Sequence, residues 1–225
     1  HPRYSKKGAV PAWEMIKFSV NIHRGCFGGC SFCAIAAHQG KFVSSRSEES
    51  VMKEIDRISA LPDFRGYLTD LGGPSANMYM MKGKNQEICD KCSRPSCIWP
   101  SVCSNLKTSH RELTQLYRRV NARTDIRKAF IGSGIRYDLL FGEWNPKAGG
   151  EEREYFTELV LNHVSGRLKV APEHTADHVV NLMRKVPFNL FMKLKKEFDN
   201  LNAEYSLNYQ LVPYFISSHP GCTEK

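Results

Sequence analysis

The apolar residues of this chain alternate between two spacings, and that alternation most limits how the chain can fold. Apolar residues occupy every second position within residues 15–22, which predicts a strand. Further on, Val51, Ile55 and Ile58 recur at helical spacing, so a helix follows the strand. Strand and helix patterns then repeat along the chain. The further strands are predicted at residues 66–71, 129–131, 168–171 and 207–216.

Four helical connections separate the five predicted strands. Their signals, in chain order, are a capping box at Ser45 and Glu48, a second at Ser109 and Glu112, an amphipathic run at residues 156–164, and a run from Thr175 that Pro187 interrupts. Parallel strands joined by helices make right-handed crossovers, so this order predicts an α/β fold with a parallel sheet. The pattern alone leaves open whether the sheet is doubly wound or part of a barrel.

Residues 75–108 break the alternation, because they show no clear periodicity. We therefore divide the chain into an N-terminal segment at residues 1–14 and one core at residues 15–225 that contains this insert. The chain begins at His1 rather than at a methionine, and it ends at Lys225 shortly after an apolar run. We expect it to be a piece of a longer protein, with a core that is incomplete at its C-terminus.

The cysteines and the charge narrow the class of protein. Seven of the eight cysteines fall into two tight groups in a chain of 225 residues, which is large enough to fold without disulfides, so metal binding is favoured. The net charge of +9 favours anionic partners, of which RNA is one. No stretch reaches the roughly 18 apolar residues of a membrane span, and no signal peptide pattern occurs. We expect a soluble cytoplasmic protein that binds no membrane.

The first cysteine group consists of Cys26, Cys30 and Cys33, which lie within eight residues just after the first predicted strand. Glycines between them permit the tight turns that wrap one compact metal centre. Three thiolates on a four-iron cubane leave the fourth iron open to a small molecule, which suits a catalytic cluster. A zinc site completed by His23 or His38 is the alternative.

The run from His23 to Cys33 resembles the cluster-binding motif of the radical S-adenosylmethionine (SAM) superfamily, and specifically that of YgiQ-type radical SAM proteins. Further similarity lies at residues 46–50, 70–79, 133–138 and 218–221. The resemblance covers nearly the whole chain. It implies a partial TIM-like (β/α) barrel, with about five of the six parallel strand-helix units of the family in this chain.

By this resemblance, the first cysteine group ligates a 4Fe-4S cluster, and SAM lies across the carboxyl ends of the strands. Phe32, the aromatic residue before the third cysteine, is expected near the adenine. Gly72 and Gly73 are expected at the methionine end of SAM. Pro74 stands where the superfamily often has a glutamate. Backbone carbonyls would then accept from the SAM ammonium in place of that carboxylate.

Polar residues at the ends of the later strands are candidates for binding the ribose and carboxylate of SAM. They are Ser133, Arg136 and Glu173. The planar fork of Arg136 suits a carboxylate, although a structural pair with Asp138 or Glu143 is an equal alternative. Glu173 is placed either to accept from ribose hydroxyls or to cap the next helix.

The second cysteine group lies inside the insert and supplies four thiols. Its members are Cys89, Cys92, Cys97 and Cys103. Four thiolates suit either a structural zinc ion or a fully ligated iron-sulfur cluster, and the spacing does not choose between them. A metal-free loop is the third interpretation. A metal would organise an insert that has few apolar anchors.

These features favour a radical SAM enzyme. Reductive cleavage of SAM at the three-cysteine 4Fe-4S cluster would give a 5′-deoxyadenosyl radical, which abstracts hydrogen from a substrate that the sequence does not identify. Such an enzyme needs a one-electron reductant such as flavodoxin or ferredoxin. The alternative function is a zinc-organised, basic nucleic-acid-binding module without turnover.

Overall fold

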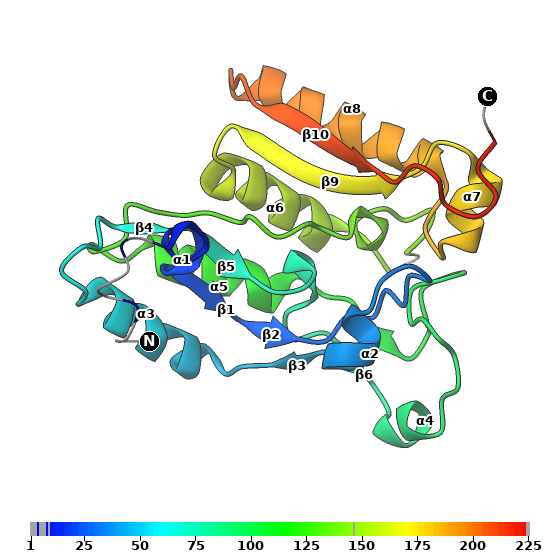
Figure 1. Cartoon of the computed structure of the whole chain (residues 1–225), viewed down its shortest axis with the longest axis horizontal. Helices are drawn as coiled ribbons and strands as arrows, with labels where there is room; N and C mark the ends of the chain where they lie inside the picture. Colours follow the sequence, from blue (N-terminus) through cyan, green and yellow to red (C-terminus); the bar gives the residue numbers. More distant parts are fainter. Residues whose placement is uncertain (1–3, 5–7, 9, 146, 224–225) are drawn as a thin grey trace.

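The computed structural model describes residues 4, 8, 10–145 and 147–223. Helices and strands alternate along the chain (Figure 1). The helices are α1 (Pro11–Ile16), α2 (Ile35–Gln39), α3 (Glu48–Ser59), α4 (Gln86–Asp90), α5 (Arg111–Asn121), α6 (Gly150–Glu158), α7 (Asp177–Leu182) and α8 (Phe188–Glu204), with short 3-10 turns η2 (Ala76–Met78) and η3 (Tyr137–Leu139) and a π-helical turn η4 (Leu159–His163). The strands are β1 (Ser19–Asn21), β2 (His23–Arg24), β3 (Ser44–Ser45), β4 (Tyr67–Leu68), β5 (Asp70–Gly72), β6 (Lys82–Gly83), β7 (Leu106–Lys107), β8 (Lys128–Ala129), β9 (Arg167–Glu173) and β10 (Gln210–Phe215).

Three parallel strand pairs carry the fold. β1 pairs with β5, β4 pairs with β8, and β9 pairs with β10. A backbone hydrogen bond of 2.9 Å from Leu71 N to Phe130 O connects the first two pairs. These pairings confirm a mixed α/β fold with parallel strands at the five predicted places. Among the residues that the structure describes, the strand pairs do not close into a barrel.

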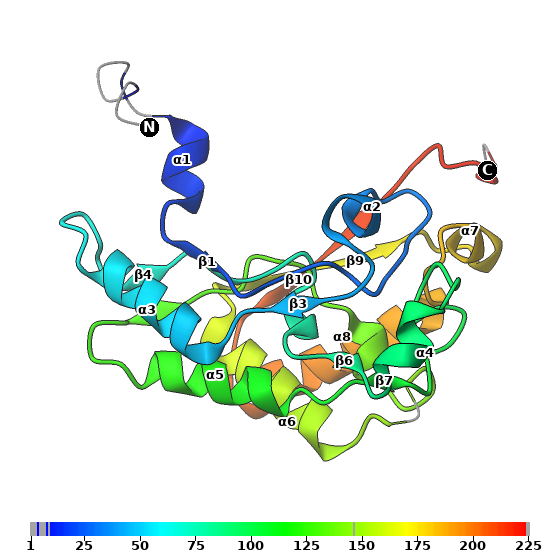
Figure 2. The ribbon, with the colours of Figure 1, turned by 90° about the horizontal axis from the view of Figure 1, so that it is seen from below.

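The amphipathic helices α3, α5, α6 and α8 lie along one side of the strands (Figure 2). In α3 the buried residues are Val51, Ile55 and Ile58, as the helical spacing predicts. These apolar faces join the inward side chains of the strands in one large hydrophobic cluster, whose burial is the main source of stability. No helix in the described part of the chain is long and apolar enough to cross a membrane.

The insert at residues 75–108 is closed by an antiparallel strand pair. β6 and β7 pair so that Gly83 lies opposite Leu106, and α4 and the second cysteine group lie between them. A second, smaller hydrophobic cluster joins this insert to the first cysteine loop. It includes Met78, Met81, Cys97, Ile98, Val102 and Leu106 from the insert, and Cys26 and Phe27 from the loop.

The predicted start of the first strand is wrong. Pro11–Ile16 forms α1, because Pro11 occupies the first helical turn, where its missing N–H costs nothing. Met15 and Ile16 are 74% and 58% exposed, so the apolar alternation there does not report a buried strand face. Of the predicted N-terminal segment at residues 1–14, residues 1–3, 5–7 and 9 lie outside the described residues.

Both predicted capping boxes are also misplaced. Ser47, not Ser45, caps α3 by accepting a 3.2 Å hydrogen bond from Ser50 N. Ser45 instead lies in β3, opposite His23. α5 begins without a side-chain cap after His110, and Glu112 pairs with Lys107 at 2.6 Å. In both places the tertiary contacts decide the helix start, because several local partners compete for the same polar side chains.

Candidate metal and cofactor site

The first cysteine loop, residues 25–33, is a tight backbone turn after β2. Gly25 has a φ of +84°, and a Cβ there would lie 2.2 Å from Phe42 O. Gly29 has a φ of +56°, and a Cβ there would lie 2.1 Å from Pro95 O. Only glycine adopts this conformation without strain and leaves room for those carbonyls. The loop therefore depends on its glycines, as the sequence predicts.

The three thiols of this loop are free. Cys26 is buried, whereas Cys30 and Cys33 are partly exposed. Two donors point at the sulfur atoms: Gly28 N lies 3.4 Å from Cys26 Sγ, and Arg136 Nη1 lies 3.4 Å from Cys30 Sγ. Hydrogen-bond donors and a guanidinium stabilise thiolates, which are the form of cysteine that binds metals.

These residues fit the iron-sulfur cluster that the sequence predicts. Among the described residues, no group of three or more His, Cys, Asp or Glu side chains is arranged to hold a metal ion. An iron-sulfur cubane is a larger body than one ion, so its thiolates stand further apart than the ligands of zinc. Free thiols, a glycine-dependent turn and sulfur-directed donors are what such a cluster requires of the protein.

Arg136 reaches the first cysteine loop from the segment that follows β8. It is buried and pairs with Asp138, with Nε at 3.1 Å from Oδ1 and Nη2 at 2.5 Å from Oδ2. Burial alone would lower the pKa of Arg136, but the neighbouring Asp138 carboxylate and the Cys30 thiol raise it well above its usual value. The guanidinium is therefore a permanent positive charge beside Cys30. The predicted pair with Asp138 is present.

A second buried cation, Lys185, was missed in the sequence. Its ammonium lies 3.5 Å from Glu173 Oε1, and both side chains are almost fully buried. Burial lowers the pKa of Lys185, and the Arg136 charge lowers it further, against the influence of Cys30 and Glu173. Glu173 has a φ of +71°, a conformation that costs free energy for a residue with a side chain. Strained residues of this kind gather at functional sites.

Gly72, Gly73 and Ser133 come together at the ends of β5 and β8. They line a cavity of about 250 Å³ together with Ser19, Val20, Asn21, Ile35, Gln39, Asp70 and Pro74. The carboxylate of Asp70 accepts hydrogen bonds from Gly132 N at 2.9 Å and from Ser133 Oγ at 2.7 Å. Sequence reasoning missed this role of Asp70, although a carboxylate inside an apolar strand is a signal. Phe32 does not line this cavity and is 40% exposed on the cysteine loop.

His23, the alternative zinc ligand, is fully buried against Gly73. A Cβ on Gly73 would lie 2.5 Å from His23 Cε1, so the imidazole occupies the space that a side chain there would need. Neither ring nitrogen makes a hydrogen bond of good geometry. Burial lowers the pKa of His23 to about 4, although the nearby Ser75 backbone opposes the shift. The ring is therefore neutral at pH 7. His38 is exposed on α2.

Backbone hydrogen bonds within the insert link the cysteines of the second group in two pairs. Cys92 N donates to Cys89 O at 3.0 Å, and Cys103 N donates to Cys97 O at 2.8 Å, so each pair closes a turn. Burial raises the pKa of the Cys97 thiol to about 11, with Lys41 opposing the shift and the other three thiols adding to it. The other three thiols therefore each lie within electrostatic range of Cys97.

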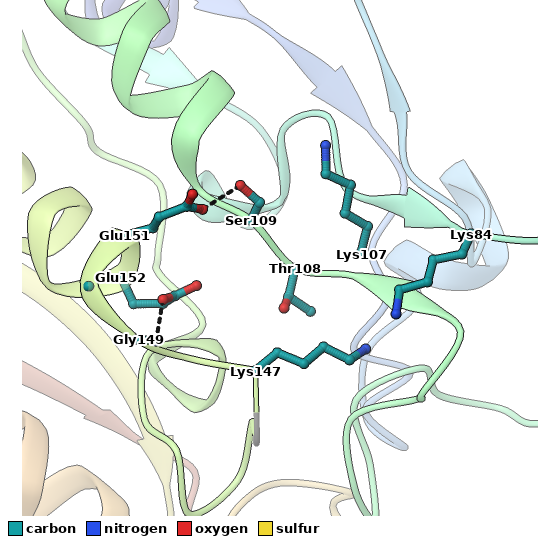
Figure 3. Close-up of a pocket in the computed structure, with 9 residues that line it drawn as sticks. Lys84, Lys107, Thr108, Ser109, Lys147, Gly149, Glu151 and Glu152 are labelled. Atoms are coloured by element: carbon teal, nitrogen blue, oxygen red, sulfur yellow. Dashed lines mark hydrogen bonds between the residues drawn. The ribbon is translucent and has the colours of Figure 1, made fainter.

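A separate cavity of about 350 Å³ lies between the insert and the starts of α5 and α6 (Figure 3). Lys84, Lys107 and Lys147 line it together with Glu151 and Glu152. Ser109 Oγ donates to Glu151 Oε2 at 2.6 Å across its edge. None of the residues predicted for the cluster or for SAM lines this cavity.

Comparison with curated proteins finds relatives along the whole chain. The chain is similar to UPF0313 proteins. It is 59% identical to the UPF0313 protein of Bacteroides thetaiotaomicron and 56% identical to that of Porphyromonas gingivalis, over 100% of this chain and 36% of each relative. The UPF0313 protein of Pseudomonas syringae pv. tomato is 46% identical, over 100% of this chain and 28% of the relative.

The chain thus spans about a third of the length of these UPF0313 proteins. No family model matches it. The shared name states no activity, so the function must be argued from the residues of the site.

Proposed function

We propose that this chain is the radical SAM core of an enzyme of the YgiQ type, in which Cys26, Cys30 and Cys33 hold a 4Fe-4S cluster and SAM binds the open iron. When bound, these groups would supply a 5′-deoxyadenosyl radical by reductive cleavage of SAM, and that radical would abstract hydrogen from the substrate. The observation that carries the proposal is a loop of three free thiols, folded around obligatory glycines, with a buried guanidinium donating to Cys30.

The charges around the loop support this proposal. A cluster held by three thiolates carries excess negative charge, and burying such charge is costly unless cations lie nearby. Arg136 and Lys185 are two buried cations within electrostatic range of Cys30. Their own carboxylate partners, Asp138 and Glu173, hold them in place. These two ion pairs would orient the cations and keep them from solvent.

The cavity at the ends of β5 and β8 is where we expect SAM to meet the protein. Gly72 and Gly73 expose backbone there, and the Asp70 carboxylate holds the loop that carries Ser133. We infer that Ser133 acts through this loop, because its hydroxyl already donates to Asp70. Arg136 and Glu173 remain our candidates for polar contacts with SAM, and Phe32 our candidate for the adenine.

We further propose that the parallel strands form part of an incomplete TIM-like barrel. The parallel pairs are β1 with β5, β4 with β8, and β9 with β10, and helices separate the successive strand regions along the chain. The long helices lie on one side of these strands (Figure 2). That arrangement is typical of a (β/α) barrel wall.

A one-electron reductant such as flavodoxin or ferredoxin in the cytoplasm would serve the cluster.

The test is anaerobic reconstitution of the full-length protein with iron and sulfide, followed by electron paramagnetic resonance of the reduced protein with and without SAM. We expect a cluster signal that SAM changes. Cys30→Ala should abolish that signal, whereas Cys222→Ala, which removes a thiol remote in sequence from both groups, should retain it. A cluster signal that does not change when SAM is added, or one that is retained in Cys30→Ala, would refute the proposal. Zinc in place of iron at the first group would favour the nucleic-acid-binding alternative.

A further inference from the structure

His23 is a buried side chain that the function proposed above leaves without a role. It lies in β2 and is fully buried. Both of its ring nitrogens lack a hydrogen-bond partner, and no other buried side chain in the described part of the chain has two unpartnered polar atoms. Buried nitrogens without a partner are rare in folded proteins and costly in free energy. The imidazole therefore points to a ligand that would supply the partner.

The ring of His23 stands where a side chain of Gly73 would begin. A Cβ on Gly73 would lie 2.5 Å from Cε1, 2.7 Å from Nε2 and 2.8 Å from Nδ1 of the imidazole. Gly73 also lines the cavity of about 250 Å³ at the ends of β5 and β8, where we expect the methionine end of SAM. Because glycine has no side chain, no Gly73 atom beyond the backbone separates the ring from that cavity.

The first cysteine group lies close to the same ring. Ile22 N donates to Gly72 O at 2.8 Å, which ties the chain just before His23 to the glycine pair. The Ser75 backbone opposes the lowering of the His23 pKa by burial, and the Ser75 hydroxyl lies 3.6 Å from Cys26 Sγ. The ring therefore lies near both the glycine pair and a cluster ligand, the two features between which we expect the methionine end of SAM.

The residue after the glycine pair cannot supply the acceptor that the radical SAM superfamily often has there. Pro74 stands in place of a glutamate, and the proline side chain has no polar atom. As a neutral ring, the imidazole of His23 offers one acceptor nitrogen and one N–H donor. The polar side chain at this strand end is thus supplied by β2.

We propose that His23 is a SAM-binding residue, whose acceptor nitrogen receives an N–H of the SAM amino group beside Gly73. His23 would take the part of the superfamily's glutamate, but from β2 instead of from the residue after the glycine pair. The bond would give a partner to a nitrogen that is otherwise buried without one. The backbone carbonyls expected at the glycine pair would accept the remaining N–H. This inference rests on the proposed function, because it requires SAM in the cavity.

The experiment measures ligand affinity, not turnover, in the full-length protein after anaerobic reconstitution of the cluster. The ligands are SAM and the SAM analogue in which hydrogen replaces the amino group. His23→Leu removes both ring nitrogens, His23→Gln keeps an acceptor oxygen, and His178→Leu is the exposed control. We expect His23→Leu to weaken SAM binding by about tenfold or more, since a buried N–H would lose its acceptor. Binding of the analogue should hardly change, His23→Gln should lose less SAM affinity than His23→Leu, and His178→Leu should match the wild type.

Two results in His23→Leu would overturn the inference: unchanged SAM affinity, or an equal loss for SAM and for the analogue, because the ring would then only shape the cavity. If His23→Leu does not fold, His23→Met carries the same comparison, since methionine is flexible and has no strong acceptor. A wild type that binds SAM and the analogue equally well overturns the inference without any variant. Each of these results leaves the proposed function standing if SAM still changes the cluster signal. A wild type that does not bind SAM refutes the proposed function itself.

Discussion

Asp138→Asn tests whether the buried ion pair beside the first cysteine loop stabilises the fold as we describe. Asp138 accepts from Arg136 Nε at 3.1 Å and from Nη2 at 2.5 Å, and both side chains are buried. Asparagine has the same size and shape but carries no charge. The Arg136 guanidinium would then stay buried without its carboxylate, because Asn77 holds the Arg136 backbone in place at 2.7 and 3.0 Å.

Breaking a buried ion pair by removing one partner costs about 3–5 kcal/mol. Asparagine can still accept one hydrogen bond, and the Cys30 sulfur remains 3.4 Å from the guanidinium, so we expect the lower end, about 3 kcal/mol. For a domain of this size, 1 kcal/mol corresponds to about 2–4 °C in melting temperature, so the melting temperature should fall by about 6–12 °C.

Urea unfolding followed by circular dichroism measures this loss in the free energy of unfolding. Asp199→Asn is the matched control, because its pair with Lys195 is exposed and should contribute less than about 0.5 kcal/mol. A double variant, Arg136→Met/Asp138→Leu, removes both charges and should be less destabilised than Asp138→Asn. A loss below about 1 kcal/mol in Asp138→Asn, or a double variant that is no better than the single one, would refute the reasoning.

Three further predictions follow from the same region. Burial lowers the pKa of His23 to about 4, so between pH 6.5 and 4 the unfolded chain binds a proton that the folded chain does not. The free energy of unfolding should therefore decrease by up to about 3 kcal/mol as the pH is lowered through this range. In urea unfolding of the apoprotein, His23→Gln should reduce this pH dependence, whereas the exposed control His178→Gln should not. Gly29→Ala should destabilise the chain by at least about 2 kcal/mol and prevent iron binding, and Gly150→Ala, where a Cβ meets open space, should do neither. Lys185→Met removes a positive charge near the first cysteine group, so it should lower the midpoint potential of the cluster by on the order of tens of millivolts in a redox titration. Exposed Lys193→Met is the control. An unchanged potential in Lys185→Met would contradict our placement of the Lys185 charge.

The parallel fold was predictable from the sequence because apolar spacing records which face of an element is buried. This inference from spacing fails where exposed apolar residues happen to have the spacing of buried ones. Ile16 extends the alternation of the first strand by chance, and only Pro11 hints at the helix to which it belongs. The cap of α3 was misplaced by two residues, since the choice between Ser45 and Ser47 depends on the pairing of β3 with β2.

The cysteine loop was predictable because its ligands are close together in the sequence, whereas its surroundings were not. Lys185 approaches Cys30 only after α7 has turned back toward the loop, where Arg184 Nη1 donates to Gly29 O at 3.2 Å. A local sequence pattern cannot predict a contact between two residues that are 155 positions apart in the chain. In the sequence Lys185 follows Arg184 directly, and nothing in this charged pair indicates that Lys185 is the one that is buried.

The two adjacent glycines of the cysteine loop illustrate how one sequence signal can have two physical causes. Sequence reasoning assigns both to the tight turn around a metal centre. In the structure, a Cβ on Gly28 would lie 2.5 Å from Arg136 Nη1, so this glycine makes room for the cation that donates to Cys30. A Cβ on Gly29 would meet Pro95 O of the insert. A loop that only wrapped a cluster would need neither clearance. The glycine pair therefore records both the charge beside the first cysteine group and the packing of the second group onto it.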